Sequence, residues 1–239
     1  MTYCDIQEKN EQTTTEIDTR IFVGKVEQVF GLTSAINKHQ TSSSLYLSEQ
    51  GLEGDECAEL KFHGGAERAL HHYPAEHYLF WQIKYSESVS KWAAPGMGEN
   101  ISTLGMNEEN VCIGDQYQWG EAIIEVSQPR SPCYKLNQRW DVADVSTSMQ
   151  QLSRCGWLYR VIKSGMVDSN SRLTLITREE NALTVKQVCD IFFGDPLNKE
   201  ALLSLQAINK LSINWQRTIQ TRLTSGKLEN WNFRLLGHA

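Results

Sequence analysis

One cysteine stands in a stiff and basic segment, SQPRSPCYKL. Pro129 and Pro132 restrict the chain ahead of Cys133, because proline fixes the backbone angle φ. Arg130 and Lys135 place positive charges nearby, and such charges stabilise a thiolate. A thiolate is both a nucleophile and a ligand for soft metals. The segment therefore indicates chemistry at sulfur, with a plain turn cysteine among solvated charges as the alternative.

A second segment, FHGGAERALHHY, combines a glycine pair with an arginine and histidines. Gly64 and Gly65 can present backbone N–H groups to an anion, and Arg68 can make a forked contact with phosphate. The alternative is a hairpin turn with a surface arginine. His63 and His72 are candidate proton donors, since a free imidazole titrates near about pH 6.5.

A zinc site is a further alternative, because His63, His71, His72 and Glu76 lie close together in the sequence. The spacing does not favour it, since no H-E-x-x-H pattern is present and the histidines fall on different predicted elements. Cysteine pairs of the C-x-x-C type are also absent. We interpret most cysteines as buried thiols; the six are Cys4, Cys57, Cys112, Cys133, Cys155 and Cys189.

Short strands are predicted to carry these segments. Alternating or apolar stretches separated by Gly-rich turns indicate strands at 21–30, 44–49, 57–62, 68–73, 114–128 and 172–177. Many short strands with few helices between them favour an antiparallel barrel. One helix is predicted to begin at Pro74 and to run through AEHYLFWQIK. Asn100, in the turn segment GENIS, is a candidate donor and acceptor for a polar pocket.

The chain after residue 181 has helical character. Thr184 and Gln187 fit a capping box, and Asp195 before Pro196 fits a helix start. Ser212 can begin a further helix, which we expect Gly226 to end. We predict a loose tail at 1–20, a β-barrel domain at 21–180 and a three-helix domain at 181–239.

Composition excludes several classes of function. The 239 residues, 40% of them hydrophobic, suffice for one sizeable core. A net charge of −6 and a pI near 5.6 do not favour a nucleic-acid polymer or a membrane surface as partner. Neither a membrane-spanning apolar run nor a secretory signal is apparent in the sequence, so we expect a cytoplasmic protein.

Taken in order, GLEGD, HGGAERALHHYPAEHY, GENIST, IGD and SQPRSPCYKL resemble the MOSC family, named after the C-terminal domain of molybdenum cofactor sulfurase. The resemblance runs from about Val23 to the C-terminus. It is strongest to stand-alone bacterial members of the YiiM type, which are linked to resistance against N-hydroxylated purines. It implies a mainly β fold, a closed or partly open barrel of the pyruvate-kinase-like type, with a C-terminal three-helix unit.

The resemblance also implies that the barrel binds molybdenum cofactor, with Cys133 as thiolate ligand to the metal. The residues expected to bind the cofactor are Ser34, Lys38, His63, Gly64, Gly65, Arg68, Asn100, Arg130, Cys133 and Lys135. Cys133, with His63 or His72 as proton donor, would form the catalytic group. The implied activity is an oxidoreductase that reduces N-hydroxylated bases such as hydroxylaminopurine to the amine.

Two other functions remain open. The first is a molybdenum cofactor carrier without turnover, and the second is a hydrolase or transferase that uses Cys133 as nucleophile. The resemblance does not extend to the cysteine-desulfurase half or the ferredoxin-like cluster of longer relatives. We therefore expect electrons to arrive from an external donor, a reductase or a small reductant. The sequence leaves the oligomeric state open, with a homodimer as one alternative.

Overall fold

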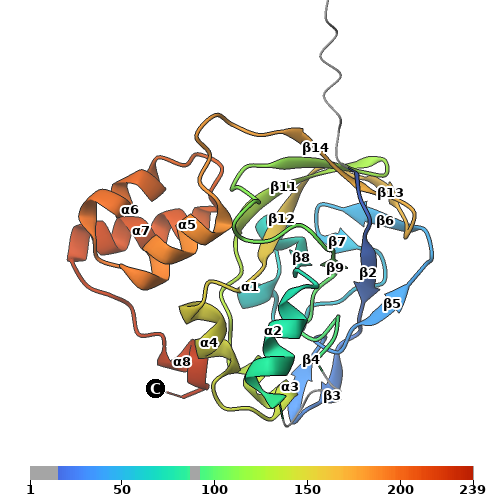
Figure 1. Ribbon diagram of the computed structural model, residues 1–239, viewed down its shortest axis with the longest axis horizontal. Helices are drawn as coiled ribbons and strands as arrows, with labels where there is room; N and C mark the ends of the chain where they lie inside the picture. The colour runs from blue at the N-terminus through green and yellow to red at the C-terminus, as the bar shows by residue number, and fades with distance from the viewer. Residues whose placement is uncertain (1–15, 87–91, 239) are drawn as a thin grey trace, which may run out of the picture.

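The structure of the protein, a computed structural model, describes residues 16–86 and 92–238. Within these ranges nine strands form one curled sheet in the order β1-β14-β10-β11-β12-β8-β9-β2-β5, and helices gather beside it (Figure 1). The mainly β, barrel-like fold with C-terminal helices is therefore confirmed. The strands of this sheet are β1 (Glu16–Ile17), β2 (Arg20–Val23), β5 (His39–Thr41), β8 (Leu70–His72), β9 (Ile101–Ser102), β10 (Gln116–Trp119), β11 (Ala122–Pro129), β12 (Trp157–Lys163) and β14 (Leu173–Thr177).

Two small sheets complete the β part. One joins β13 (Gly165–Val167), β6 (Leu45–Ser48) and β7 (Gly51–Leu52), and the other joins β3 (Glu27–Val29) and β4 (Leu32–Ser34). Nearly all strand pairs are antiparallel; β8 and β9 pair in parallel. The sheet curls because its strands twist and because β11 carries irregularities in its pairing with β12.

The hairpin of β10 and β11 confirms the clearest strand prediction. Ala122, Ile124 and Val126 are fully buried, so the apolar half of the alternating pattern forms the core face. Trp119 pairs with Ala122 across a tight turn in which Gly120 has φ +55°. Strand β11 ends at Pro129. Residues 130–136, which we call the Cys133 segment, therefore directly follow the longest strand of the sheet.

Two strand predictions are wrong. The segment 57–62 forms no strand. Its second half belongs to the single helical turn α1 (Leu60–His63), where the His63 N–H donates to Glu59 O at 2.8 Å. The predicted strand 21–30 divides at Gly24, because the Gly24 N–H donates to the Asp55 carboxylate at 2.7 Å instead of continuing a ladder. The predicted tail is shorter than 1–20, since β1 begins at Glu16 and pairs with β14. Residues 1–15 lie outside the described residues.

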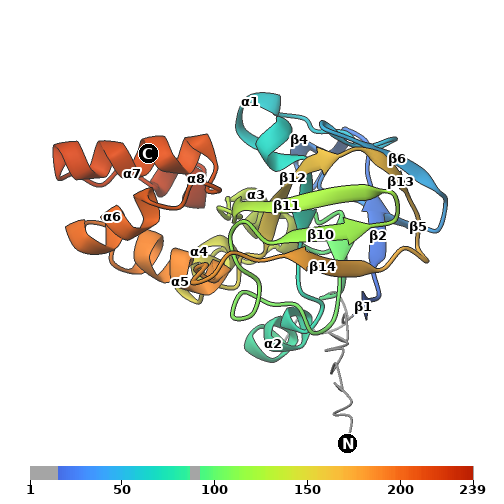
Figure 2. The same cartoon turned by 90° about the horizontal axis from the view of Figure 1, so that it is seen from above.

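The helices lie beside the sheet, and the C-terminal helices are grouped on one side of it (Figures 1 and 2). They are α1, the 3₁₀ turn Ala66–Arg68, α2 (His77–Lys84), α3 (Lys135–Trp140), α4 (Val145–Gln151), α5 (Val185–Cys189), the π-helical turn Asp190–Gly194, α6 (Lys199–Gln206), α7 (Ile213–Ser225) and α8 (Asn232–Leu236). Helix α2 begins three residues after Pro74. None of the described helices is long and apolar enough to cross a membrane.

The capping predictions had mixed outcomes. The capping box of Thr184 is confirmed, with Gln187 N–H donating to its hydroxyl at 3.1 Å. Ser212 caps α7, which ends at Gly226 with φ +63°. The start at Asp195 is wrong, because Asn198 caps α6 by accepting a hydrogen bond from Ala201 N–H at 3.1 Å.

The sheet and the C-terminal helices share one core. Trp215 and Ile219 of α7 belong to the same hydrophobic cluster as Trp119 and Trp157 of the sheet. A second cluster lies around α2, α3 and α4, where Trp92 stacks on Trp140 with ring centroids 3.9 Å apart. Helix α8 was not predicted, and it contacts α4 (Figure 1). The C-terminal helices therefore pack on the sheet domain at more than one place.

Candidate functional site

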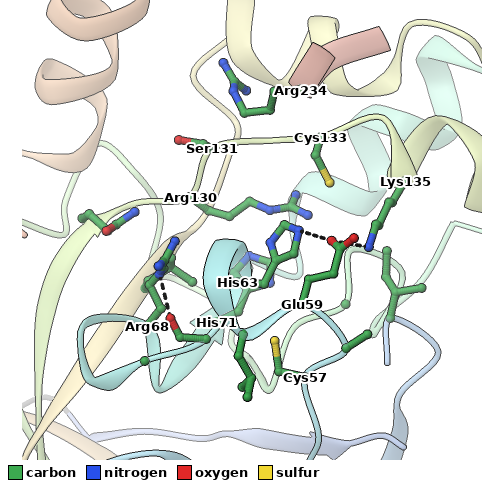
Figure 3. A pocket seen from close by; sticks show the side chains of 18 of the residues that line it. Cys57, Glu59, His63, Arg68, His71, Arg130, Ser131, Cys133, Lys135 and Arg234 are labelled. Atoms are coloured by element: carbon green, nitrogen blue, oxygen red, sulfur yellow. Dashed lines mark hydrogen bonds and ion pairs between the residues drawn. The ribbon is translucent and has the colours of Figure 1, made fainter. Parts of the chain in front are cut away.

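A cleft of about 980 Å³ lies between the sheet domain and the C-terminal helices (Figure 3). One wall comes from α1, the 3₁₀ turn and the segment after β11, and the other from α7 and the residues that follow it. The cleft brings together every residue expected to bind the cofactor: Ser34, Lys38, His63, Gly64, Gly65, Arg68, Asn100, Arg130, Cys133 and Lys135. The functional roles of these residues stay predictions.

Cys133 lies between the end of β11 and the start of α3. The Arg130 N–H donates to Gly156 O at 3.0 Å, and the Leu136 N–H donates to Cys133 O at 3.1 Å, so both ends of the segment are held. Cys133 is 7% exposed. Figure 3 shows its sulfur pointing toward the side chains of Arg130 and His63. The sulfur is therefore fixed at the wall of the cleft.

Two buried polar atoms in the cleft have no hydrogen-bond partner among the residues that the structure describes. They are Nη1 of Arg130 and Nε2 of His71. Burial, followed by the nearby charge of Arg130, holds the pKa of His71 well below its usual value. Buried polar groups are nearly always hydrogen-bonded in folded proteins, so two such atoms in one cleft point to an absent ligand. A guanidinium donor selects an anion.

Lys135 does not face the cleft as a free charge. Its Nζ lies 2.6 Å from Glu59 Oε2, and His63 Nε2 lies 3.4 Å from the same oxygen. The hydrogen bond from Lys135 lowers the pKa of Glu59. Desolvation within the cleft and the charges of Arg130 and Lys135 lower the pKa of His63 to about 4, although 43% of its side chain is exposed. The ring is therefore uncharged at neutral pH.

Lys38 and Asn100 build the wall around Asp55. Lys38 Nζ forms an ion pair with the Asp55 carboxylate, and Asn100 Nδ2 donates to Asp55 Oδ2 at 2.8 Å. The Asn100 side-chain oxygen accepts from the His71 N–H at 3.1 Å. These groups therefore satisfy one another, and they hold His71 in place at the cleft.

The glycine pair is a connection between α1 and the 3₁₀ turn, not a hairpin turn. Gly65 has φ +99°, a conformation that other residues rarely adopt. Arg68 Nε donates to Gly64 O at 3.1 Å, which ties its side chain to the turn. The turn thus places the Arg68 guanidinium at the same cleft as Arg130.

His72, the second candidate proton donor, does not line the cleft. His72 is fully buried, with Nδ1 3.0 Å from Tyr159 Oη and Nε2 2.8 Å from Thr103 Oγ1. Burial lowers its pKa to about 3. Neighbouring residues of a strand point to opposite faces, so His71 reaches the cleft while His72 enters the core. The same alternation separates His71 from His72, two members of the alternative zinc site. The described residues contain no group of three or more His, Cys, Asp or Glu suited to a metal ion.

Sequence reasoning missed part of the site. Glu59, Cys57 and Arg234 line the cleft, and Cys57 is half-buried and free, not a core thiol. The wall from the C-terminal helices is aromatic. Its members are Phe192, Phe193, Trp215, Trp231 and Phe233. No signal in the sequence marked these residues, because aromatic residues are about as frequent after residue 190 as in the chain as a whole.

Comparison with known proteins gives consistent matches. The model described as MOSC domain matches residues 59–174, and the one described as YiiM-like, 3-alpha helix domain matches residues 183–226. Protein YiiM of Escherichia coli (strain K12) is 45% identical over 218 residues, which are 91% of this chain and 97% of that protein. A crystal structure of YiiM from Escherichia coli superimposes with a TM-score of 0.82 at 39% identity, covering 93% of this chain and all of the other. A Gibberella moniliformis protein named Reductase is 38% identical over 148 residues, 62% of this chain and 26% of its own length.

Proposed function

The chain belongs to the MOSC domain family, and on that premise we propose that it is a molybdenum-cofactor-binding oxidoreductase that reduces N-hydroxylated bases such as hydroxylaminopurine to the amine. Oxidoreductase activity is also suggested by the relative named Reductase, of which this chain spans about a quarter. The observation that carries the proposal is that Cys133 lines the same cleft as the unpartnered buried atoms of Arg130 and His71.

The residues of the cleft fit an anionic group that carries a soft metal. The sulfur of Cys133 suits molybdenum, because a thiolate is a soft ligand. Arg130 and Arg68 suit the phosphate of the pterin, and Arg130 has a buried N–H with no partner among the described residues. When bound, the cofactor supplies the electron pair of the reduction and an affinity for oxygen. The Cys133 segment, Arg130 and His71 would orient it.

The aromatic wall favours an enzyme over a carrier. Trp231 is half-buried, and its ring makes an edge contact with Phe193 at 5.8 Å between centroids. Phe233, also in the wall, is 65% exposed. Flat aromatic side chains suit the face of a heteroaromatic base, and such stacking contributes roughly 1–3 kcal/mol per base in nucleic-acid complexes. A carrier has no evident use for an aromatic wall opposite its anion site.

The reduction R–NH–OH + 2e⁻ + 2H⁺ → R–NH₂ + H₂O needs protons at the leaving oxygen. His63 is the remaining candidate, since His72 lies in the core. An anionic ligand would offset the charges of Arg130 and Lys135, which are among the causes that keep the His63 ring neutral. We propose that His63 gains a proton when the cleft is filled and donates it to the departing hydroxyl.

The electrons are proposed to come from an external donor, a reductase or a small reductant. The test is therefore turnover of hydroxylaminopurine by cofactor-loaded protein with a low-potential chemical reductant, followed by chromatography of adenine. Product that requires both cofactor and reductant supports the oxidoreductase. Retention of cofactor without product leaves the carrier, and activity of cofactor-free protein would indicate the nucleophilic cysteine alternative.

A further inference from the structure

The C-terminal helix α8 contacts the Cys133 segment on both sides of the cysteine. Arg234 Nη1 donates to Pro132 O at 2.5 Å. The Tyr134 N–H donates to Arg234 O at 2.8 Å. One residue thus binds the chain immediately before and immediately after Cys133, although about a hundred positions separate them in the sequence.

Helix α8 is itself anchored to the helices that follow the cysteine. Leu235 O accepts from Ser146 Oγ at 2.8 Å and from Asn137 Nδ2 at 3.2 Å. Arg234 Nη2 donates to Gln150 Oε1 at 2.6 Å, which fixes the guanidinium against α4. The guanidinium therefore spans two acceptors on separate elements, a geometry that suits the planar fork of arginine and not the single ammonium of lysine.

The charge of Arg234 also lies close to the cleft. Burial lowers the pKa of its guanidinium, while the nearby Cys155 and Cys133 sulfurs act in the opposite direction. Figure 3 shows Arg234 on the far side of the Cys133 segment from Arg130. Arg130 belongs to the segment itself, whereas Arg234 comes from α8 and binds the backbone of the segment.

We propose that Arg234 is a positioning residue, which clamps the Cys133 segment so that the sulfur stays at the wall of the cleft. Its importance for catalysis rests on the proposed role of Cys133, but the clamp itself does not. The C-terminal helices would then do more than shape the cleft, because their last turn sets the position of the cysteine. Loss of the clamp should let the segment open locally without unfolding the protein.

The test is the rate at which iodoacetamide alkylates Cys133 in the folded, cofactor-free protein, followed by peptide mass spectrometry. The measurement is made at about pH 9.5, above the ordinary thiol pKa of about 8.5, so that loss of a positive charge does not dominate the rate. Arg234→Ala should raise the rate about tenfold or more, since the segment loses the charge-assisted hydrogen bond to Pro132 O. Arg234→Lys should fall between Arg234→Ala and the natural protein.

Arg217→Ala is the matched control, because Arg217 is exposed on α7 and does not line the cleft. It should leave the rate unchanged. If Arg234→Ala does not fold, two milder variants, Ser146→Ala and Arg234→Lys, replace it. Ser146→Ala removes the hydrogen bond to Leu235 O that anchors α8, so it should raise the alkylation rate by a smaller factor. The proposal is overturned if the folded Arg234 variants react at a rate within twofold of the natural protein. It is also overturned if both Ser146→Ala and Arg234→Lys do so. Because neither cofactor nor substrate is present, the outcome is independent of the proposed reaction.

Discussion

Lys135 Nζ lies 2.6 Å from Glu59 Oε2, and this ion pair joins the Cys133 segment to the residue that precedes α1. The lysine is buried, whereas the Glu59 side chain is 43% exposed. The Glu59 carboxylate thus neutralises the charge of Lys135, which the sequence analysis expected to bind an anionic ligand. Arg130 has a buried N–H without a partner among the described residues, and we therefore propose it as the principal anion-binding group of this wall.

Glu59→Gln should strengthen binding of anions in the cleft. The substitution removes a negative charge and frees Lys135, so the affinity for inorganic phosphate should rise up to about fivefold, as suits a partly exposed charge. Phosphorus NMR titration at constant ionic strength measures the change. Glu109→Gln, at an exposed position outside the cleft, is the control. An unchanged or weaker affinity in Glu59→Gln would mean that the anion binds elsewhere.

Arg130→Ala should have the opposite effect on binding and little effect on stability. Loss of a charge-assisted contact of roughly 1.5–3 kcal/mol should weaken phosphate binding about tenfold or more. The free energy of unfolding should hold or rise, because an unsatisfied buried N–H is removed. Phosphate titration and urea unfolding test the two halves separately. A protein that binds phosphate normally but unfolds more easily would show that Arg130 is structural.

His63 should respond to the anion. In the ligand-free protein its pKa is about 4, because partial desolvation in the cleft and the charges of Arg130 and Lys135 oppose protonation. Phosphate beside Arg130 should offset that charge and raise the pKa of His63 toward its usual value. NMR of the ring proton, recorded from pH 4 to 8 with and without phosphate, follows the shift. The signal of the exposed His39 should not respond to phosphate, and a His63 titration independent of phosphate would remove its proposed role as proton donor.

Local patterns in the sequence predicted the barrel-like fold, whereas the set of polar residues in the cleft came from the resemblance to the family. Alternation in the β11 segment and the capping residues of α5 and α7 determine their elements almost independently of context. The resemblance to the family brought Cys133, Arg68 and Arg130 into one site. The structure then showed that they line a common cleft.

The errors share a physical origin in contacts between distant segments. His71 and His72 differ only in the strand face that each occupies, and the sequence alone did not assign the faces. Lys135 is compensated by Glu59 from a segment 76 positions away. Arg234 reaches the Cys133 segment across 102 positions, so its role could not be read from spacing.

His72 should make the protein sensitive to acid. Its pKa is about 3 in the folded state and about 6.5 in an unfolded chain, so the unfolded state binds more protons between these values. The contribution of neutral His72 to the free energy of unfolding is therefore fully present above pH 6.5 and is lost as the pH falls toward 3. This histidine alone should lower the free energy of unfolding by about 2 kcal/mol between pH 7 and pH 5. Urea unfolding of His72→Gln at both pH values should show a pH dependence smaller by about that amount, and an equal dependence would contradict the buried neutral ring.

The proposal that Cys133 holds molybdenum in the cleft depends on one substitution above all. Serine keeps the shape of cysteine but lacks the soft thiolate, so Cys133→Ser should fold normally and lose the metal. Cys57→Ser is the matched control, because Cys57 is a free thiol that lines the same cleft.

The most direct measurement is therefore the molybdenum content of the natural protein, Cys133→Ser and Cys57→Ser, each isolated from a host that makes the cofactor. We predict molybdenum in the natural protein and in Cys57→Ser, and its loss from Cys133→Ser at an unchanged unfolding midpoint. Equal molybdenum content in Cys133→Ser and the natural protein, or none in any of the three folded proteins, would contradict the account.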